Sequence, residues 1–271
     1  MPKKRFTVGK QNFGPELFFI LGPCVIESEK FLFRMAKKIR NICDGEGVSF
    51  IFKASYDKAN RTSLKSFRGS GVRDGCRMLA EAGAAIGAPV TTDVHLPDEI
   101  SIAAEHIDLL QIPAFLCRQT DLITSAAQSG KPVNVKKGQF LAPWDVRPIA
   151  EKLTAAGCKQ FFFTERGTTF GYNNLVVDMR SIYWMQELGY PVIFDATHSV
   201  QRPGGGGDST TGDGKLAPML AKAAVAAGCR IIFIETHENP KKALSDGPNQ
   251  IPLSLLPKVL RQLKAIAELP A

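Results

Sequence analysis

Short apolar runs rich in β-branched and aromatic residues recur along the 271-residue chain, and this recurrence restricts its fold more than any other feature. Eight runs have the length of a strand: residues 17–23, 48–54, 88–94, 107–114, 132–137, 159–165, 191–197 and 230–236. Between them, segments such as 29–42 and 216–228 repeat apolar residues at helical spacing. Nearly continuous apolar strands that alternate with helices are typical of a parallel sheet covered on both faces.

Eight strand–helix units in one chain predict an α/β protein with a (β/α)8 TIM barrel, a fold that runs to roughly 250 residues as one unit. A doubly wound open sheet is the alternative, but no GxGxxG motif opens a helix after the first strand. No segment has the composition of a linker between domains, so we expect residues 1–271 to form a single barrel domain. Residues 3–14 precede the first unit, and we expect them to form a short N-terminal hairpin that plugs the bottom of the barrel.

The composition is that of an ordinary globular protein, with 44% hydrophobic and 22% charged residues. The sequence has neither a long uncharged apolar span nor an apolar leader, so we expect a cytoplasmic protein without a membrane partner. The six cysteines are scattered and form no CxxC pair, which indicates reduced thiols. The net charge of +8 favours acidic partners, either polyanions or small phosphorylated substrates.

Chemically active side chains follow each predicted strand. In strand order they are Cys24 and Glu27; the segment 53–61; Asp93 and His95; Gln111; Lys136 and Lys137; Glu165 and Arg166; Asp195 and His198; and Glu235 and His237. The active sites of these barrels lie at the C-terminal ends of the strands. The sequence therefore predicts an active site at this end.

Several of these residues are cations, which we expect at one opening of the barrel: Lys53, Lys58, Arg61, Lys136, Lys137 and Arg166. Cations crowded together repel one another unless an anion binds among them, so they indicate a phosphate or carboxylate ligand. Arg61 and Arg166 are the strongest candidates, because a guanidinium group can hold such an anion through two parallel hydrogen bonds. Any single lysine can instead extend to solvent.

A thiol, an imidazole and two carboxylates form a second candidate set: Cys24, His198, Glu235 and, in the loop after the eighth strand, Asp246. Mixed sulfur, nitrogen and oxygen ligands suit a divalent metal such as Fe, Zn, Mn or Co. A lone cysteine is more often a buried core residue, however. The spacing of these residues does not choose between the two interpretations.

Longer blocks of sequence contain most of these residues: GPCVIES, FKASYDKANRTS, TTDVH, QIPAFLCRQTDL, NVKKGQF, TERGTTFGYNNLVVDMRS, FDATHSVQ, IETHENP and LSDGPNQIPLS. These blocks and their order resemble the 3-deoxy-D-manno-octulosonate 8-phosphate synthase family over nearly the whole chain. Members of that family condense phosphoenolpyruvate with D-arabinose 5-phosphate. The resemblance implies a (β/α)8 barrel, in agreement with the periodicity.

The resemblance also implies roles for individual residues. Those expected to bind phosphoenolpyruvate are Lys53, Ser55, Lys58, Gln111, Lys136 and Arg166. Those expected at the sugar phosphate are Asn60, Arg61 and Thr62, where the family usually has serine in place of Thr62. Asp93 and Phe115 would line the space between the two substrates. Those expected to take part in catalysis are Lys53, Lys136, His198 and Asp246.

The family divides into metal-dependent and metal-independent branches. The metal-independent branch has asparagine at the position of Cys24, so the resemblance places this chain in the metal-dependent branch. The implied ligands of a divalent Fe, Zn, Mn or Co ion are Cys24, His198, Glu235 and Asp246. The neighbouring Ser245 also resembles that branch.

The resemblance implies a homotetramer in which Arg61 reaches a neighbouring active site, and a role in lipopolysaccharide biosynthesis. The nearest alternative is a 3-deoxy-D-arabino-heptulosonate 7-phosphate synthase, which uses erythrose 4-phosphate and typically has KPRTS where this chain has KANRTS. A more distant alternative is a basic protein that binds nucleic acid or another anion. Nucleic acid is not an expected partner, because acidic residues interrupt the basic ones and no pattern of stacking aromatic residues accompanies them.

Overall fold

Eight parallel strands close into a barrel in the computed structural model, which describes residues 5–61, 63–204 and 211–269. The strands are β3 (Phe18–Gly22), β4 (Ser49–Lys53), β5 (Val90–Asp93), β6 (Leu109–Ile112), β7 (Val133–Lys136), β8 (Phe161–Glu165), β11 (Val192–Asp195) and β14 (Ile231–His237). Each pairs with the next, and β14 closes the ring by pairing with both β11 and β3. The eight predicted strands and the (β/α)8 barrel are confirmed.

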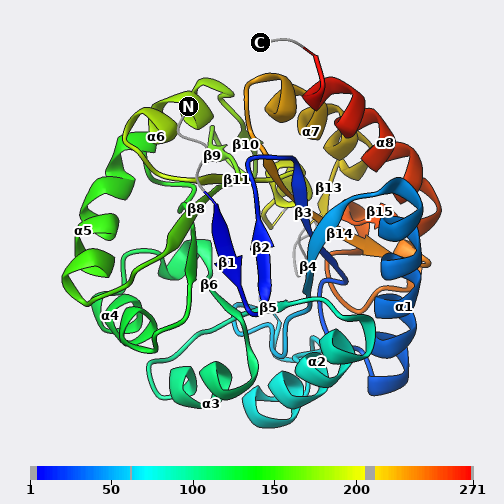
Figure 1. Ribbon diagram of the computed structural model, residues 1–271, viewed down its shortest axis with the longest axis horizontal. Helices are drawn as coiled ribbons and strands as arrows, with labels where there is room; N and C mark the ends of the chain where they lie inside the picture. The colour runs from blue at the N-terminus through cyan, green and yellow to red at the C-terminus, as the bar shows by residue number, and fades with distance from the viewer. Residues whose placement is uncertain (1–4, 62, 205–210, 270–271) are drawn as a thin grey trace.

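Helices surround the barrel on its outer face (Figure 1). They are α1 (Glu29–Glu46), α2 (Val72–Ile86), α3 (Glu99–His106), α4 (Thr120–Gln128), α5 (Arg147–Ala155), α6 (Arg180–Glu187), α7 (Ala217–Ala226) and α8 (Leu256–Ala267). Helix α1 shows how the sequence sets their limits. The Ser28 hydroxyl accepts a hydrogen bond from the Phe31 amide at its start, and Gly47 ends it in the left-handed conformation. Within the described ranges, no helix is both long enough and apolar enough to cross a bilayer.

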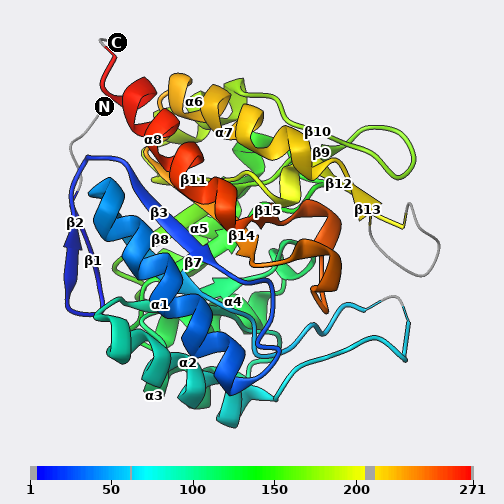
Figure 2. The same ribbon diagram turned by 90° about the vertical axis from the view of Figure 1, so that its right-hand side faces the viewer.

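Short elements occupy the connections. The short strands are β9 (Thr168–Thr169), β10 (Leu175–Val176), β12 (Gln201–Arg202), β13 (Thr211–Gly212) and β15 (Ile251–Pro252). The 3₁₀ helices are η1 (Ala114–Leu116), η2 (Pro143–Val146), η3 (His198–Val200), η4 (Gly214–Leu216), η5 (Pro240–Lys242), η6 (Gly247–Asn249) and η7 (Leu253–Leu255). The β9–β10 and β12–β13 hairpins extend from one end of the barrel (Figure 2).

Side chains alternate between two hydrophobic cores because successive residues of a strand point to opposite faces. In β3, for example, Phe19 and Leu21 pack toward the helices, whereas Phe18 and Ile20 fill the barrel interior. Toward the C-terminal ends the inward positions become polar and remain buried: Lys53, Asp93, Gln111, Lys136, Asp195 and Glu235. The same alternation therefore places apolar side chains inside the N-terminal end of the barrel and polar side chains inside its C-terminal end.

A hairpin of β1 (Phe6–Val8) and β2 (Gln11–Phe13) lies across the opposite end of the barrel (Figure 2). Val8 and Phe13 are buried and belong to the interior core. The Phe13 ring lies 4.5 Å from that of Phe18, and the Phe6 ring 4.9 Å from that of Phe162. The predicted N-terminal hairpin is confirmed, and it plugs the bottom of the barrel.

Because Phe13 is 2% exposed, Phe13→Ala is expected to lower the free energy of unfolding by about 3–5 kcal/mol through loss of buried surface and the cavity left behind. Urea denaturation at neutral pH measures the change. Asn12→Ala, an exposed position on the same hairpin, is the matched control and should cost no more than about 1.5 kcal/mol. Equal urea midpoints for Phe13→Ala and Asn12→Ala would contradict the conclusion that Phe13 closes the bottom of the barrel.

Candidate active site

A cavity of about 610 Å³ opens at the C-terminal ends of the strands. Most of the residues singled out from the sequence line it: Lys58, Asn60, Arg61, Asp93, Phe115, Lys136, Arg166, His198 and Asp246. They lie at the ends of seven of the eight strands or in the loops that follow them, as expected when the strands of a closed barrel all end on one face.

Five other predicted residues are buried and do not line the cavity: Cys24, Lys53, Ser55, Gln111 and Glu235. Each is at most 1% exposed. Thr62 lies outside the described residues. Thus the structure gathers the predicted residues in two layers, a cavity wall and a buried layer that contacts it.

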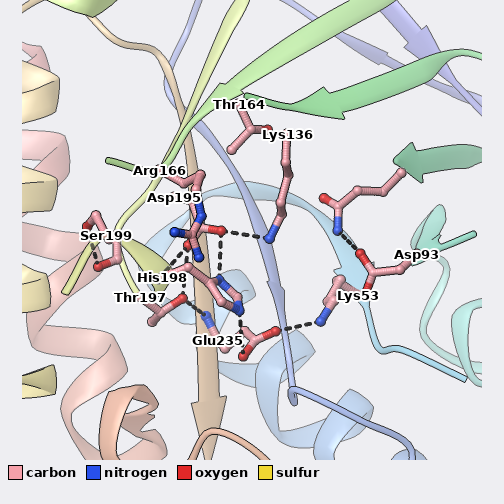
Figure 3. Close-up of polar contacts among 12 residues, drawn as sticks. Lys53, Asp93, Lys136, Thr164, Arg166, Asp195, Thr197, His198, Ser199 and Glu235 are labelled. Carbon is pink, nitrogen blue, oxygen red and sulfur yellow. Dashed lines mark hydrogen bonds and ion pairs between the residues drawn. The ribbon is translucent and has the colours of Figure 1, made fainter. Parts of the chain in front are cut away.

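Asp195, at the end of β11, holds two of the predicted residues in place (Figure 3). Its Oδ2 lies 2.7 Å from Lys136 Nζ and 2.7 Å from His198 Nδ1, while its Oδ1 accepts from the His198 amide. Burial opposes ionisation, but the charges of His198 and Lys136 hold the pKa of Asp195 well below its usual range. From the sequence, Asp195 was expected only at the end of a strand and had no assigned role, although its inward position in the strand was a usable signal.

Lys53 and Glu235 form a second buried pair, with Lys53 Nζ 2.5 Å from Glu235 Oε1. Lys53 also donates to the Cys24 carbonyl, and Glu235 Oε2 lies 3.6 Å from His198 Nε2. Burial alone would raise the pKa of Glu235, but Lys53 and His198 outweigh it and lower that pKa to about 2. The His198 ring therefore links the Lys136–Asp195 and Lys53–Glu235 pairs in one chain of contacts, visible in Figure 3.

Asp93 is fixed by two neighbours whose roles were predicted separately. Ser55 Oγ and Gln111 Nε2 donate to its two carboxylate oxygens, and Lys58 Nζ donates to Ser55 Oγ at 3.0 Å. Burial would raise the pKa of Asp93, but nearby Lys53 and Lys58 hold it below its usual range. Asp93 thus presents an ionised, immobilised carboxylate to the cavity.

Arg166 lines the cavity although it is only 6% exposed. Its Nη2 donates to Gln201 Oε1 at 2.6 Å. Its Nε and Nη1 are buried, and neither has a hydrogen-bond partner among the described residues. A buried donor without a partner costs about 1–3 kcal/mol, and more when charged, so these groups indicate an anion ligand.

A sulfur atom and two carboxylates converge beside these pairs. The Cys24 thiol and one oxygen each of Glu235 and Asp246 all lie within 4.8 Å of one another. The Cys24 sulfur lies within hydrogen-bond distance of Ser245 Oγ at 3.0 Å and of Asp246 Oδ2 at 3.4 Å, and burial, then Glu235, raises the pKa of the thiol. His198 lies outside this group of three, but its Nε2 faces Glu235. Sulfur, oxygen and nearby imidazole donors fit a borderline divalent metal, whose charge would stabilise the thiolate.

Asp246 has an unusual backbone conformation, with φ of 48° in the left-handed region. The loop is held on both sides: Glu27 Oε1 accepts from the Leu244 amide at 3.0 Å, and Gln250 Nε2 donates to the Ser245 carbonyl at 2.8 Å. A non-glycine residue in this region is strained, and such strain concentrates at functional sites.

Arg61 lies at the cavity wall of its own chain. Its Nε donates to the Phe67 carbonyl at 2.9 Å and its Nη2 to the Leu244 carbonyl at 3.3 Å. The expected contact of Arg61 with a neighbouring subunit concerns a second chain and stays a prediction.

Lys137 contradicts the expectation that all six cations face one opening. It follows Lys136 and therefore points to the opposite side of β7. Its Nζ donates to the Leu141 carbonyl and to Thr168 Oγ1, and it lies 3.6 Å from Glu165 Oε2. Lys137 is therefore a buried structural cation outside the cavity.

The barrel has cations, an ionised carboxylate and potential metal ligands at its C-terminal end. These features define the class of α/β-barrel enzymes that act on anionic substrates. More particularly, the chain belongs to the DAHP synthetase I family, whose pattern matches residues 5–269. It is 54% identical over 265 residues to a protein of Geobacter sp. strain M21, covering 97% of each chain. It is 56% identical over 253 residues to one of Cyanothece sp. strain PCC 7425, covering 93% of each. Both relatives are named 2-dehydro-3-deoxyphosphooctonate aldolase.

Proposed function

We propose that this chain condenses phosphoenolpyruvate with D-arabinose 5-phosphate and water to give 3-deoxy-D-manno-octulosonate 8-phosphate and inorganic phosphate, for lipopolysaccharide biosynthesis. The names of the relatives specify an eight-carbon phosphorylated product. A three-carbon phosphoenolpyruvate then requires a five-carbon aldose phosphate. The observation that carries the proposal is the buried Arg166 guanidinium at the cavity wall. Two of its nitrogens have no hydrogen-bond partner among the described residues, and they fit a phosphate or carboxylate oxygen.

Phosphoenolpyruvate is assigned to the part of the cavity near Arg166, Lys136 and Lys58. Arg166 offers a planar pair of donors, and the two lysines add positive charge. Lys53, Ser55 and Gln111 act from the buried layer by holding Glu235 and Asp93. Asp93 and Phe115 line the same cavity and separate this position from the sugar.

The sugar phosphate is assigned to the loop after β4, where Asn60 and Arg61 line the cavity. Thr62 completes this group in the sequence. We further propose a homotetramer, in which Arg61 reaches the site of a neighbouring subunit. The Arg61 side chain is partly exposed, and its hydrogen bonds within the chain go to two backbone carbonyls.

The proposed reaction is an aldol-type condensation. Carbon 3 of phosphoenolpyruvate attacks the aldehyde, water adds at carbon 2, and the resulting hemiketal phosphate loses phosphate by C–O cleavage. Lys136 and Arg166 fix the anionic substrate and stabilise the negative charge that develops. Asp195 holds the His198 ring through Nδ1, and this contact leaves Nε2 facing Glu235.

Cys24, His198, Glu235 and Asp246 would hold a divalent ion, and this ion would supply Lewis-acid chemistry. Divalent Fe, Zn, Mn and Co all accept these sulfur, nitrogen and oxygen ligands. Contacts from neighbouring residues keep both carboxylates oriented toward the thiol. Glu235 is held by Lys53, and Asp246 by Gln201.

Phosphate release from phosphoenolpyruvate with each of two aldoses tests the activity. We expect release with arabinose 5-phosphate to exceed release with erythrose 4-phosphate at least about tenfold, a difference of about 1.4 kcal/mol in transition-state binding. A preference for erythrose 4-phosphate would assign the chain instead to the heptulosonate branch of the DAHP synthetase I family. No release with either aldose would reject both.

Chelation tests the metal. Treatment with EDTA is expected to abolish phosphate release, and addition of Co²⁺, Zn²⁺, Mn²⁺ or Fe²⁺ should restore it, because the paired carboxylates and thiol lose their compensating charge. Cys24→Asn is the matched variant, and it should retain activity that no longer responds to EDTA. Full wild-type activity after EDTA, with no stoichiometric metal by atomic absorption, would refute the assignment.

A further inference from the structure

We propose that Gln201 is a positioning residue that keeps Arg166 and Asp246 apart, so that the anion site and the metal-ligating carboxylate are available together. This inference rests on the proposed function for the identity of the anion, phosphoenolpyruvate. It assigns a role to a residue that sequence analysis did not single out, although Gln201 lines the cavity.

The amide of Gln201 lies between two groups of opposite charge. Its Oε1 accepts from Arg166 Nη2 at 2.6 Å, and its Nε2 donates to Asp246 Oδ1 at 3.2 Å. A guanidinium group only donates and a carboxylate accepts, so the two contacts fix which end of the amide faces each partner. Gln201 is therefore held in one orientation.

The local fold explains why this residue reaches both partners. Helix η3 begins at His198, and residues three apart in a 3₁₀ helix lie on the same side. Gln201 follows that helix, and its backbone N–H donates to the His198 carbonyl. Gln201 also begins β12 and pairs with Gly212 in β13. Backbone hydrogen bonds thus fix the base of its side chain next to the predicted metal ligand His198.

Charge explains why a neutral amide is required. Burial lowers the pKa of Arg166, while Asp195 and then Asp246 act in the opposite direction, so Asp246 already interacts electrostatically with Arg166. A direct ion pair between them would occupy the donors of Arg166 and an oxygen of Asp246 at once. Gln201 satisfies one donor of Arg166 and one oxygen of Asp246 without neutralising either charge. This arrangement leaves Nε and Nη1 of Arg166 for the anion.

The test compares Gln201→Met with the wild-type enzyme in the full chain. Methionine keeps the length and volume of glutamine but makes neither hydrogen bond, so Arg166 and Asp246 can pair. Two quantities are measured: Co²⁺ affinity, from the thiolate-to-cobalt absorption band in competition with a chelator, and phosphoenolpyruvate affinity, by calorimetry and as KM. Loss of a residue that orients a metal ligand typically costs 10- to 100-fold in metal affinity.

We expect Q201M to weaken both affinities about tenfold or more, while KM for the aldose changes less than about twofold. Gln186→Met is the matched control, because Gln186 lies on α6 outside the cavity and bonds Gly228. It should change neither affinity. Gln201→Glu is a second variant in case Q201M does not fold. It should weaken phosphoenolpyruvate binding further, because its carboxylate neutralises Arg166.

Wild-type affinities for both Co²⁺ and phosphoenolpyruvate in a folded Q201M enzyme would overturn the inference. Loss of one affinity alone would also overturn it, because the inference requires both to change together. Failure of the proposed function gives a different result, namely a wild-type enzyme that releases no phosphate. Cobalt titration and calorimetry with phosphoenolpyruvate still test Gln201 in that case, since neither measurement needs turnover.

Discussion

Replacing Arg166 with methionine is expected to lower kcat/KM for phosphoenolpyruvate by about 10²- to 10⁴-fold. The side chain is 6% exposed, and two of its nitrogens lack a partner among the residues that the structure describes. If both bind the substrate anion, the variant loses two charge-assisted hydrogen bonds, worth about 1.5–3 kcal/mol each. Steady-state assays of phosphate release measure the loss.

The Arg166→Met variant should be at least as stable as the wild type, although its activity falls. This combination distinguishes a binding role of Arg166 from a structural role. Arg166→Met removes a buried charge whose hydrogen bonds are incomplete, and such replacements are often neutral or stabilising. Arg166→Lys is the matched control. It keeps the charge but not the planar pair of donors, so its activity should lie between those of Arg166→Met and the wild type. A large fall in stability with Arg166→Met would indicate that the guanidinium serves the fold.

Replacing Asp195 with alanine is expected to reduce both activity and stability. Asp195 is fully buried between Lys136 and His198, so its removal leaves the Lys136 ammonium without its carboxylate. Breaking a buried ion pair in this way costs about 3–5 kcal/mol. Urea denaturation measures the stability, and phosphate release measures the activity.

Asp98→Ala is the control for Asp195→Ala, since Asp98 is exposed and its side chain makes no capping hydrogen bond to α3. It should change stability by no more than about 0.5 kcal/mol. If Asp195→Ala unfolded at the same urea concentration as Asp98→Ala, the Asp195 contacts would contribute little. Lys136 and His198 would then need another explanation for their fixed positions.

Local patterns predicted most of the barrel. Strand β14 (Ile231–His237), for example, begins with four apolar residues that occupy both of its faces, which is typical of a buried parallel sheet. The polar residue types at strand ends predicted which end holds the cavity. The hairpin Phe6–Phe13 was predictable because it precedes the first strand and carries alternate apolar residues. These features depend on residues close in sequence.

The pairing of side chains was harder to predict, because it depends on the register of separate strands. Lys136 and Lys137 look equivalent in sequence, yet alternation along β7 sends one into the cavity and buries the other elsewhere. The ion pair of Lys53 and Glu235 joins residues 182 positions apart. Gln201 ends the block FDATHSVQ, but its residue type alone does not indicate a role. Its position becomes meaningful only when Arg166 and Asp246 are seen on either side of it.

The left-handed backbone of Asp246 has a consequence for variation of this sequence. A non-glycine residue there costs about 1–2 kcal/mol, which glycine would relieve. Selection for thermal stability alone would therefore favour glycine at this position. Under the proposed metal site, selection for activity would instead retain aspartate. Sequence drift at position 246 consequently reports on whether a descendant of this chain still performs its chemistry.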